Sequence, residues 1–137
     1  MKKEEHHLQV ILCQYLDWNG YDFFSIPNGG LRHPRVGRAL NAEGLKAGAA
    51  DLFIVLANNT HHGLFIEVKF ADGKQQPNQK KFQSMVEHHG YCYKIVRSLD
   101  DLIDVLRIFK SDPIIDQYQA GYRSGYMDGK LQEQILR

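Results

Sequence analysis

The chain has 137 residues, a formal net charge of +1 at pH 7 and a hydrophobic share of 43%. This length predicts one domain whose core needs neither disulfides nor metals, and the balanced charge excludes a protein that binds polyanions over its whole surface. No apolar run approaches the roughly 20 residues that cross a bilayer, and no apolar segment follows Met1 to His7, so we expect a cytoplasmic protein with no membrane partner.

The N-terminal third combines regular elements with a basic segment. Apolar residues at helical spacing predict a helix over 4–19, followed by Gly20, and an aromatic-rich run predicts a strand over 21–26. The apolar positions of the helix are Leu8, Ile11, Leu12, Tyr15 and Leu16. Residues 28–50 are basic and interrupted by glycines, although 35–46 could form a short helix. A long segment of this kind is more often functional than structural.

The middle of the chain predicts the order strand, strand, helix, strand, helix. Two strands over 51–57 and 63–71 flank a turn, and a helix over 77–89 follows with Pro77 at its start and Gly90 as its stop. A strand over 91–97 leads to a helix that Ser98 caps and that runs to Lys110. The apolar side chains predicted to face inward include Phe82, Met85, Val86, Leu99, Leu102, Ile103, Leu106, Ile108 and Phe109.

The tail from Pro113 to Arg137 predicts one more helix. Tyrosines recur every four residues, and glycines do the same at Gly121, Gly125 and Gly129. Each helical glycine costs about 1 kcal/mol relative to alanine, so close packing against another surface has to offset the loss. We therefore divide the chain into a domain over 1–111 and a helical extension over 112–137 that packs on the domain or on a second copy.

The two cysteines fall in predicted core elements. Cys13 lies in the first helix and Cys92 in the fourth strand, both among apolar neighbours. Two reduced thiols are the expectation for a cytoplasmic protein, and one long-range disulfide is the alternative.

The strongest chemical signal is a set of charged residues inside apolar strands. A hairpin centred on Asn59 places Asp51 opposite Glu67, and the alternation of a strand sends Glu67 and Lys69 to the same face as Asp51. Opposed residues have Cβ atoms about 4.5–5.5 Å apart, which suits two carboxylates that hold one cation. The alternative is an ordinary ion pair on a solvated sheet face.

The chemistry of these donors selects a hard cation. Two carboxylates, a backbone carbonyl such as that of Val68, and water fit Mg²⁺ or Mn²⁺. Lys69 could orient the attacking water and offset charge on a phosphoryl transition state. The His-His pairs at 6–7, 61–62 and 88–89 lack companions at zinc spacing, so we expect surface histidines there.

These residues resemble a known family. Asp51 followed by Glu67-Val68-Lys69 resembles the PD-(D/E)xK nuclease superfamily, and the element order resembles its core. With Glu5, Gly48-x-x-Asp51, Gln79-x-x-Phe82 and Gly90-Tyr91-x-Tyr93, residues 4–108 look like a VRR-NUC domain, which small phage and bacterial proteins carry. Ala50 stands where the family often has proline.

The resemblance implies an α/β fold of the restriction-endonuclease type, with an αβββαβ core in which helices flank a mixed sheet, plus additional C-terminal helices. It implies metal ligation by Glu5, Asp51, Glu67 and the Val68 carbonyl, with Lys69 as the catalytic lysine and Gln79 in support. Glu4 competes with Glu5 for the first of these roles.

The resemblance also implies the activity. We expect a Mg²⁺- or Mn²⁺-dependent DNA endonuclease that acts as a homodimer and prefers branched DNA such as Holliday junctions. The alternatives are a DNA-binding module that kept the fold without catalysis, and a structural protein that binds neither DNA nor metal. The residues expected to contact DNA are Asn28, Arg32, Arg35, Arg38 and Lys74, within two basic groups that also include Lys46, Lys80 and Lys81.

Overall fold

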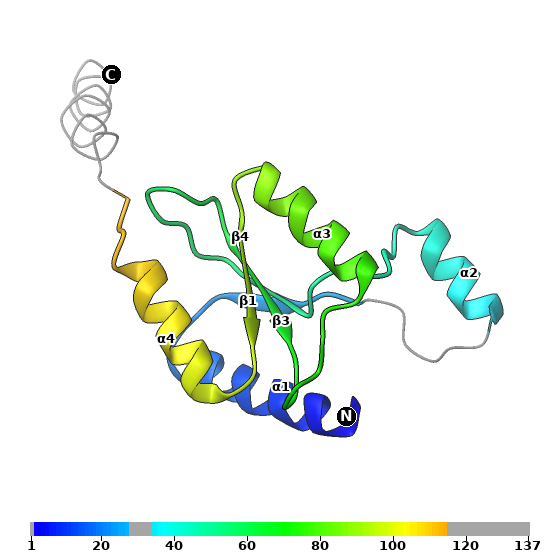
Figure 1. The fold of residues 1–137 in the computed structure, drawn as a ribbon, viewed down its shortest axis with the longest axis horizontal. Helices are drawn as coiled ribbons and strands as arrows, with labels where there is room; N and C mark the ends of the chain where they lie inside the picture. Colours follow the sequence, from blue (N-terminus) through cyan, green and yellow to red (C-terminus); the bar gives the residue numbers. More distant parts are fainter. Residues whose placement is uncertain (1, 28–33, 115–137) are drawn as a thin grey trace, which may run out of the picture.

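The fold is a four-stranded sheet with helices on both faces (Figure 1). The computed structural model describes residues 2–27 and 34–114. Helix α1 (Lys2–Trp18) and helix α4 (Leu99–Lys110) lie on one side of the sheet, and helix α3 (Pro77–His88) lies on the other. Helix α2 (Pro34–Ala42) projects away from this body and buries none of its residues.

The sheet is mixed, with the strand order β1-β2-β3-β4. Strands β1 (Phe23–Ser25), β2 (Leu52–Ile54) and β3 (Leu64–Val68) pair antiparallel, whereas β4 (Cys92–Val96) pairs parallel with β3. A parallel neighbour requires a crossover, and α3 supplies it. The pairs Leu52↔Ile66 and Ile54↔Leu64 confirm the predicted hairpin register, which continues to Asp51 opposite Glu67.

Two apolar clusters separate the faces of the sheet. The larger one joins Leu12 and Leu16 of α1 to Leu102 and Leu106 of α4 across the inward side chains of the strands. The smaller one lies beneath α3 and joins Val86 to Tyr93 and Ala50. Ile66 and Val68 are buried on the larger cluster, as predicted, so Glu67 and Lys69 lie on the α3 side.

Ser98 caps α4 as predicted, because its Oγ accepts a hydrogen bond from the Asp101 amide at 3.0 Å. The predicted helix within 35–46 exists and spans Pro34–Ala42. The strands are shorter than predicted, although backbone hydrogen bonds of Ile26, Asp51 and Val55 continue the pairing just beyond their ends. The predicted helix beyond Pro113 falls on residues 115–137, outside the described ones.

Three apolar residues predicted to face inward are instead exposed. Ile11, Met85 and Ile108 are 47%, 52% and 60% exposed. Each lies at the margin of its helix's apolar stripe, where no other element covers it among the described residues. The inward assignment of these three residues was therefore wrong, while that of Leu102, Leu106 and Phe109 is confirmed.

Both cysteines carry free thiols, which confirms the reduced state. Burial raises the thiol pKa of Cys13 and of Cys92, so neither is an activated nucleophile. None of the helices described here is both long and apolar enough to cross a membrane.

Candidate active site

Asp51 and Glu67 meet where β2 begins and β3 ends. Asp51 precedes the first residue of β2, and its amide donates to the Ile66 carbonyl at 3.1 Å. Its Oδ2 accepts a hydrogen bond from the Val68 amide at 2.7 Å, which holds the carboxylate against β3. The Asp51 and Glu67 side chains lie close enough for a protonated Glu67 to hydrogen-bond to Asp51. The predicted convergence of the two carboxyl groups is therefore present.

The Glu67 carboxyl group is buried, and its surroundings disfavour its charged form. Its residue is only 2% exposed. Burial first, and the neighbouring charge of Asp51 second, raise the pKa of Glu67 to about 8, while Lys69 acts in the opposite direction. An apo protein thus keeps a proton at a position where a cation could replace it.

Lys69 provides the positive charge of this cluster. Its Nζ lies 3.6 Å from Glu67 Oε1, and the Lys69 residue is 7% exposed. An ion pair on a solvated sheet face would leave both groups in water, so the burial of both excludes that alternative. Burying a lysine beside two carboxyl groups is costly and gives little net stability, which is typical of a functional site.

A polar network behind Glu67 fixes its two oxygens. Gln79 Nε2 donates to Glu67 Oε1 at 2.9 Å, and the Tyr93 hydroxyl donates to Oε2 at 3.5 Å. Gln75 Nε2 donates in turn to the Tyr93 hydroxyl at 3.2 Å. Burial, and then the charge of Glu67, raise the pKa of Tyr93, so its hydroxyl remains a donor. Gln79 was a predicted member of the site, whereas Tyr93 and Gln75 had no predicted role.

The start of α1 approaches the end of β3. Glu5 Oε1 accepts a hydrogen bond from the Phe70 amide at 3.4 Å, one residue beyond Lys69. This contact is made by Glu5 rather than by its competitor Glu4. The amide and carbonyl of one strand residue point the same way, so the Val68 carbonyl points, like its amide, toward the side of Asp51.

Gly48 brings α3 close to this cluster. Its φ of +88° is a backbone conformation that glycine tolerates best, and a Cβ there would lie 2.6 Å from the Asn78 carbonyl oxygen. Because Asn78 and Gln79 form the first turn of α3, this close approach sets the distance between Gln79 and Glu67.

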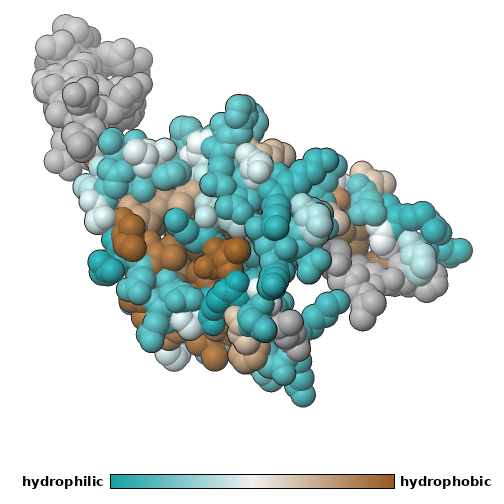
Figure 2. All heavy atoms as spheres, in the orientation of Figure 1, coloured by the Kyte–Doolittle hydropathy of each residue, from teal (hydrophilic) through white to brown (hydrophobic). Residues whose placement is uncertain are grey.

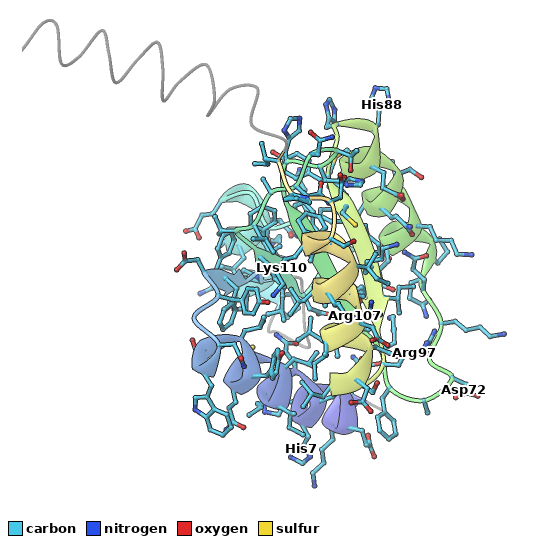
Figure 3. The ribbon with its side chains drawn as sticks, turned by 90° about the vertical axis from the view of Figure 1, so that its left-hand side faces the viewer. His7, Asp72, His88, Arg97, Arg107 and Lys110 are labelled. Atoms are coloured by element: carbon cyan, nitrogen blue, oxygen red, sulfur yellow. The ribbon has the colours of Figure 1, made fainter. Side chains whose placement is uncertain are left out.

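Arg97 holds the turn that follows Lys69. Its Nη1 donates to the carbonyls of Ala71 and Gly73, each at 2.8 Å, on either side of Asp72 (Figure 3). Ala71 has a φ of +49°, which is unusual for a residue other than glycine. The backbone that carries Lys69 is thus tied to the end of β4.

The donor set fits a hard divalent cation. Among residues 2–27 and 34–114, no three His, Cys, Asp or Glu side chains gather closely enough to hold a metal, so Glu5 does not join Asp51 and Glu67 in a three-carboxylate cluster and no zinc set of that kind forms. Two adjacent carboxyl groups, one of them buried and holding a proton, and a backbone carbonyl on the same side leave a position that Mg²⁺ or Mn²⁺ fits.

Comparison with known proteins decides the family. A family model described as the VRR-NUC domain matches residues 3–100. The chain belongs to the VRR-NUC family. Two solved structures match, and one of them, described as a VRR_NUC domain protein, has a TM-score of 0.65 at 23% identity over 80% of this chain and 89% of its own. No curated protein matches. This VRR-NUC domain therefore has the restriction-endonuclease-like α/β fold, as predicted.

Not all predicted site residues of this VRR-NUC chain lie together. Asp51, Glu67, Lys69 and Gln79 converge, and Glu5 reaches the end of β3. Arg35, Arg38 and Lys74 are exposed, the first two on the projecting helix α2. Asn28 and Arg32 lie outside the described residues.

A groove lies away from this cluster, on the other face of the sheet. A cavity of about 650 Å³ runs between β4 and α4, lined in part by Lys94, Val105 and Ile108. Figure 2 shows hydrophobic residues over α4 and beside β4 in this region. None of Asp51, Glu67 and Lys69 lines it, so we assign the chemistry to the carboxylate cluster, where buried charge and reactive side chains coincide.

Proposed function

We propose that this VRR-NUC protein is a divalent-metal-dependent DNA endonuclease. The observation that carries the proposal is the buried Glu67, adjacent to both Asp51 and Lys69. A cluster of two carboxyl groups and one lysine at the edge of a sheet suits hydrolysis of a phosphodiester. The reaction needs an activated water and a positive charge near the phosphate.

Each residue has one role in this proposal. Asp51, Glu67 and the Val68 carbonyl would hold Mg²⁺ or Mn²⁺, and Glu5 would join them through a bound water. The ion supplies Lewis acidity toward the phosphate and lowers the pKa of a bound water. Lys69 orients that water and offsets the charge that develops on the phosphate. Gln79 orients Glu67 through its hydrogen bond to Oε1.

In this proposal the DNA contacts come from residues outside the carboxylate cluster. Arg35 and Arg38 on α2, and Lys74 beyond β3, contact phosphates, together with Asn28 and Arg32. We further propose a homodimer of phage or bacterial origin that acts in the cytoplasm. It prefers branched DNA, because two sites related by a two-fold axis suit two strands of a junction. The tail from residue 112 contributes packing for that dimer.

The test is cleavage of labelled DNA by the wild-type chain and two lysine variants. Junction, flap, duplex and single-stranded substrates are incubated with Mg²⁺, Mn²⁺ or EDTA. We expect cutting only with metal and most rapidly on the junction. Lys69→Ala should lose on the order of 10²-fold or more in rate. Lys94→Ala is the matched control, because Lys94 is exposed and on the opposite face of the sheet.

Two outcomes would overturn the proposal. Cutting by Lys69→Ala at the wild-type rate would remove the proposed mechanism. A wild-type chain that shifts the junction in a gel but never cuts it would establish the alternative, a DNA-binding module without catalysis. Sedimentation of the full chain and of a chain that ends at Asp112 tests the dimer and the role of the tail.

A further inference from the structure

The sheet face that carries the carboxylate cluster is only half covered by α3. Helix α3 packs Phe82 and Val86 against Phe65 and Tyr93, above β3 and β4. Above β1 and β2 the described residues provide no covering helix. Phe24 of β1 is 54% exposed there, and Val55, just beyond β2, is 55% exposed. Phe24 and Val55 therefore leave apolar surface in solvent on the sheet face that carries the carboxylate cluster.

Phe24 is the outer end of an ordered row of rings. Its ring centroid lies 5.5 Å from that of Phe53, and the Phe53 ring lies 4.7 Å from that of Phe65. Phe65 in turn makes an edge-on contact with Phe82 at 5.3 Å. The row therefore begins beneath α3 and ends in solvent. Because each ring rests on the next, Phe24 can receive a flat ligand with little loss of side-chain entropy.

Gly63 makes room for this row. A Cβ at that position would lie 2.5 Å from Phe53 Cζ. The absence of a side chain lets the Phe53 ring lie against the start of β3 and support Phe24 from the side. The row of rings thus depends on the missing side chain at Gly63 as well as on the rings themselves.

The row lies beside the proposed metal site. Phe24 pairs with Phe53, and Phe53 is two residues along β2 from Asp51 on the same face. One strand spacing across and two residues along correspond to about 8 Å between the Cα atoms of Phe24 and Asp51. A base next to a phosphate bound at the proposed metal site can therefore reach the Phe24 ring.

We propose that Phe24 is a stacking site for an unpaired base of the DNA strand that the nuclease cuts. This inference rests on the proposed function and narrows the substrate to DNA with unpaired nucleotides next to the scissile phosphate, as at a branch or flap. Aromatic rings bind unpaired bases without sequence preference, because every base has a stackable face. A base within an intact duplex cannot reach the ring.

The experiment measures DNA binding without cleavage. The full chain is titrated against a fluorescein-labelled oligothymidylate and against a labelled duplex, in Ca²⁺ to slow cutting and again in EDTA, with Kd read from anisotropy. Phe24→Leu removes the ring but keeps an apolar side chain, and Phe24→Trp keeps an aromatic one. Trp18→Leu is the control, since Trp18 is 84% exposed but lies at the end of α1, which packs on the other face.

We expect Phe24→Leu to weaken oligothymidylate binding about tenfold or more, the effect of losing one stacked base, and to change duplex binding less than about twofold. Phe24→Trp and Trp18→Leu should bind as the wild type does. Circular dichroism melts of all variants confirm that they are folded. If Phe24→Leu binds the single strand normally, or weakens both DNAs equally, the proposal is wrong.

Two further results separate this inference from the nuclease proposal. If Phe24→Leu loses oligothymidylate binding while the wild-type chain never cuts DNA, the base-stacking site is supported and the proposed catalysis is refuted. The base-stacking site is refuted if the wild-type chain does not bind the oligonucleotide. It is also refuted if the mass of Phe24→Leu in sedimentation falls, because Phe24 would then lie in a contact between copies of the chain.

Discussion

Replacing Glu67 by Gln should stabilise the metal-free protein at alkaline pH. The glutamine keeps the shape of the side chain and an oxygen that accepts from Gln79, and its amide can donate to Asp51. What it removes is the need to ionise a buried carboxyl next to a second one. A stabilising substitution in the centre of a site is the signature of a residue kept for function rather than for the fold.

The magnitude follows from the pKa of Glu67, which is raised from 4.5 to about 8. Because the folded chain holds this proton more tightly than the unfolded chain, the free energy of unfolding falls as pH rises through this interval and is constant above it. Each pKa unit corresponds to about 1.4 kcal/mol, so the wild type should lose roughly 4–5 kcal/mol between pH 4.5 and 8 through this group alone. Glu67→Gln should lose none of it.

Urea unfolding in EDTA at several pH values from 5 to 9 measures the difference between the two chains. The curves should coincide at pH 5 and diverge above it, with the variant more stable at pH 9. Mn²⁺ should restore stability to the wild type at pH 9 and not to the variant. Glu87→Gln, an exposed position on α3, should follow the wild type throughout. Parallel curves for wild type and Glu67→Gln would refute the reasoning.

Three further substitutions test contacts that hold the fold. Gly48→Ala should lower the free energy of unfolding by about 3 kcal/mol or more, and Gly44→Ala by about 1–2 kcal/mol, because both have positive φ but only Gly48 meets the Asn78 backbone. Equal losses in urea melts would contradict this. Asn58→Ala should lower the free energy of unfolding by about 2–3 kcal/mol in the same melts, since the buried Asn58 Nδ2 donates to the Phe109 carbonyl and its Oδ1 accepts from two amides. Asn58→Asp should lower it less. Arg97→Met should loosen the turn at 70–73, so that trypsin cleaves after Lys74 under native conditions. Arg107→Met should not, because its 3.5 Å contact with Asp104 is exposed. Identical digestion patterns would contradict the role of Arg97.

The hairpin and its register could be predicted because the information is local. Strict alternation of apolar and polar residues, with a short turn between the two runs, leaves one pairing that buries Ile66 and sends Glu67 to the opposite face. The same argument gave the convergence of Asp51, Glu67 and Lys69. Ser98 and Pro77 likewise marked helix starts through chemistry that acts within one turn.

The rest depends on contacts between distant segments. Tyr93 and Gln75 reach Glu67 only because β4 lies parallel to β3, a pairing that α3 creates and that no local spacing encodes. Helical periodicity likewise identifies a stripe but not the neighbour that covers it, which is why Ile108 was assigned inward and is exposed. The groove between β4 and α4 is absent from the sequence reading for the same reason.

The proposed site draws on α1, the start of β2, the end of β3 and the first turn of α3, so Glu5 and Gln79 come from segments more than half a chain apart. Such an assembly can exist only after the long-range contacts have formed. A chain in which α3 has not yet packed against β3, such as one still emerging from the ribosome, therefore lacks the hydrogen bond from Gln79 to Glu67 and the proposed site with it.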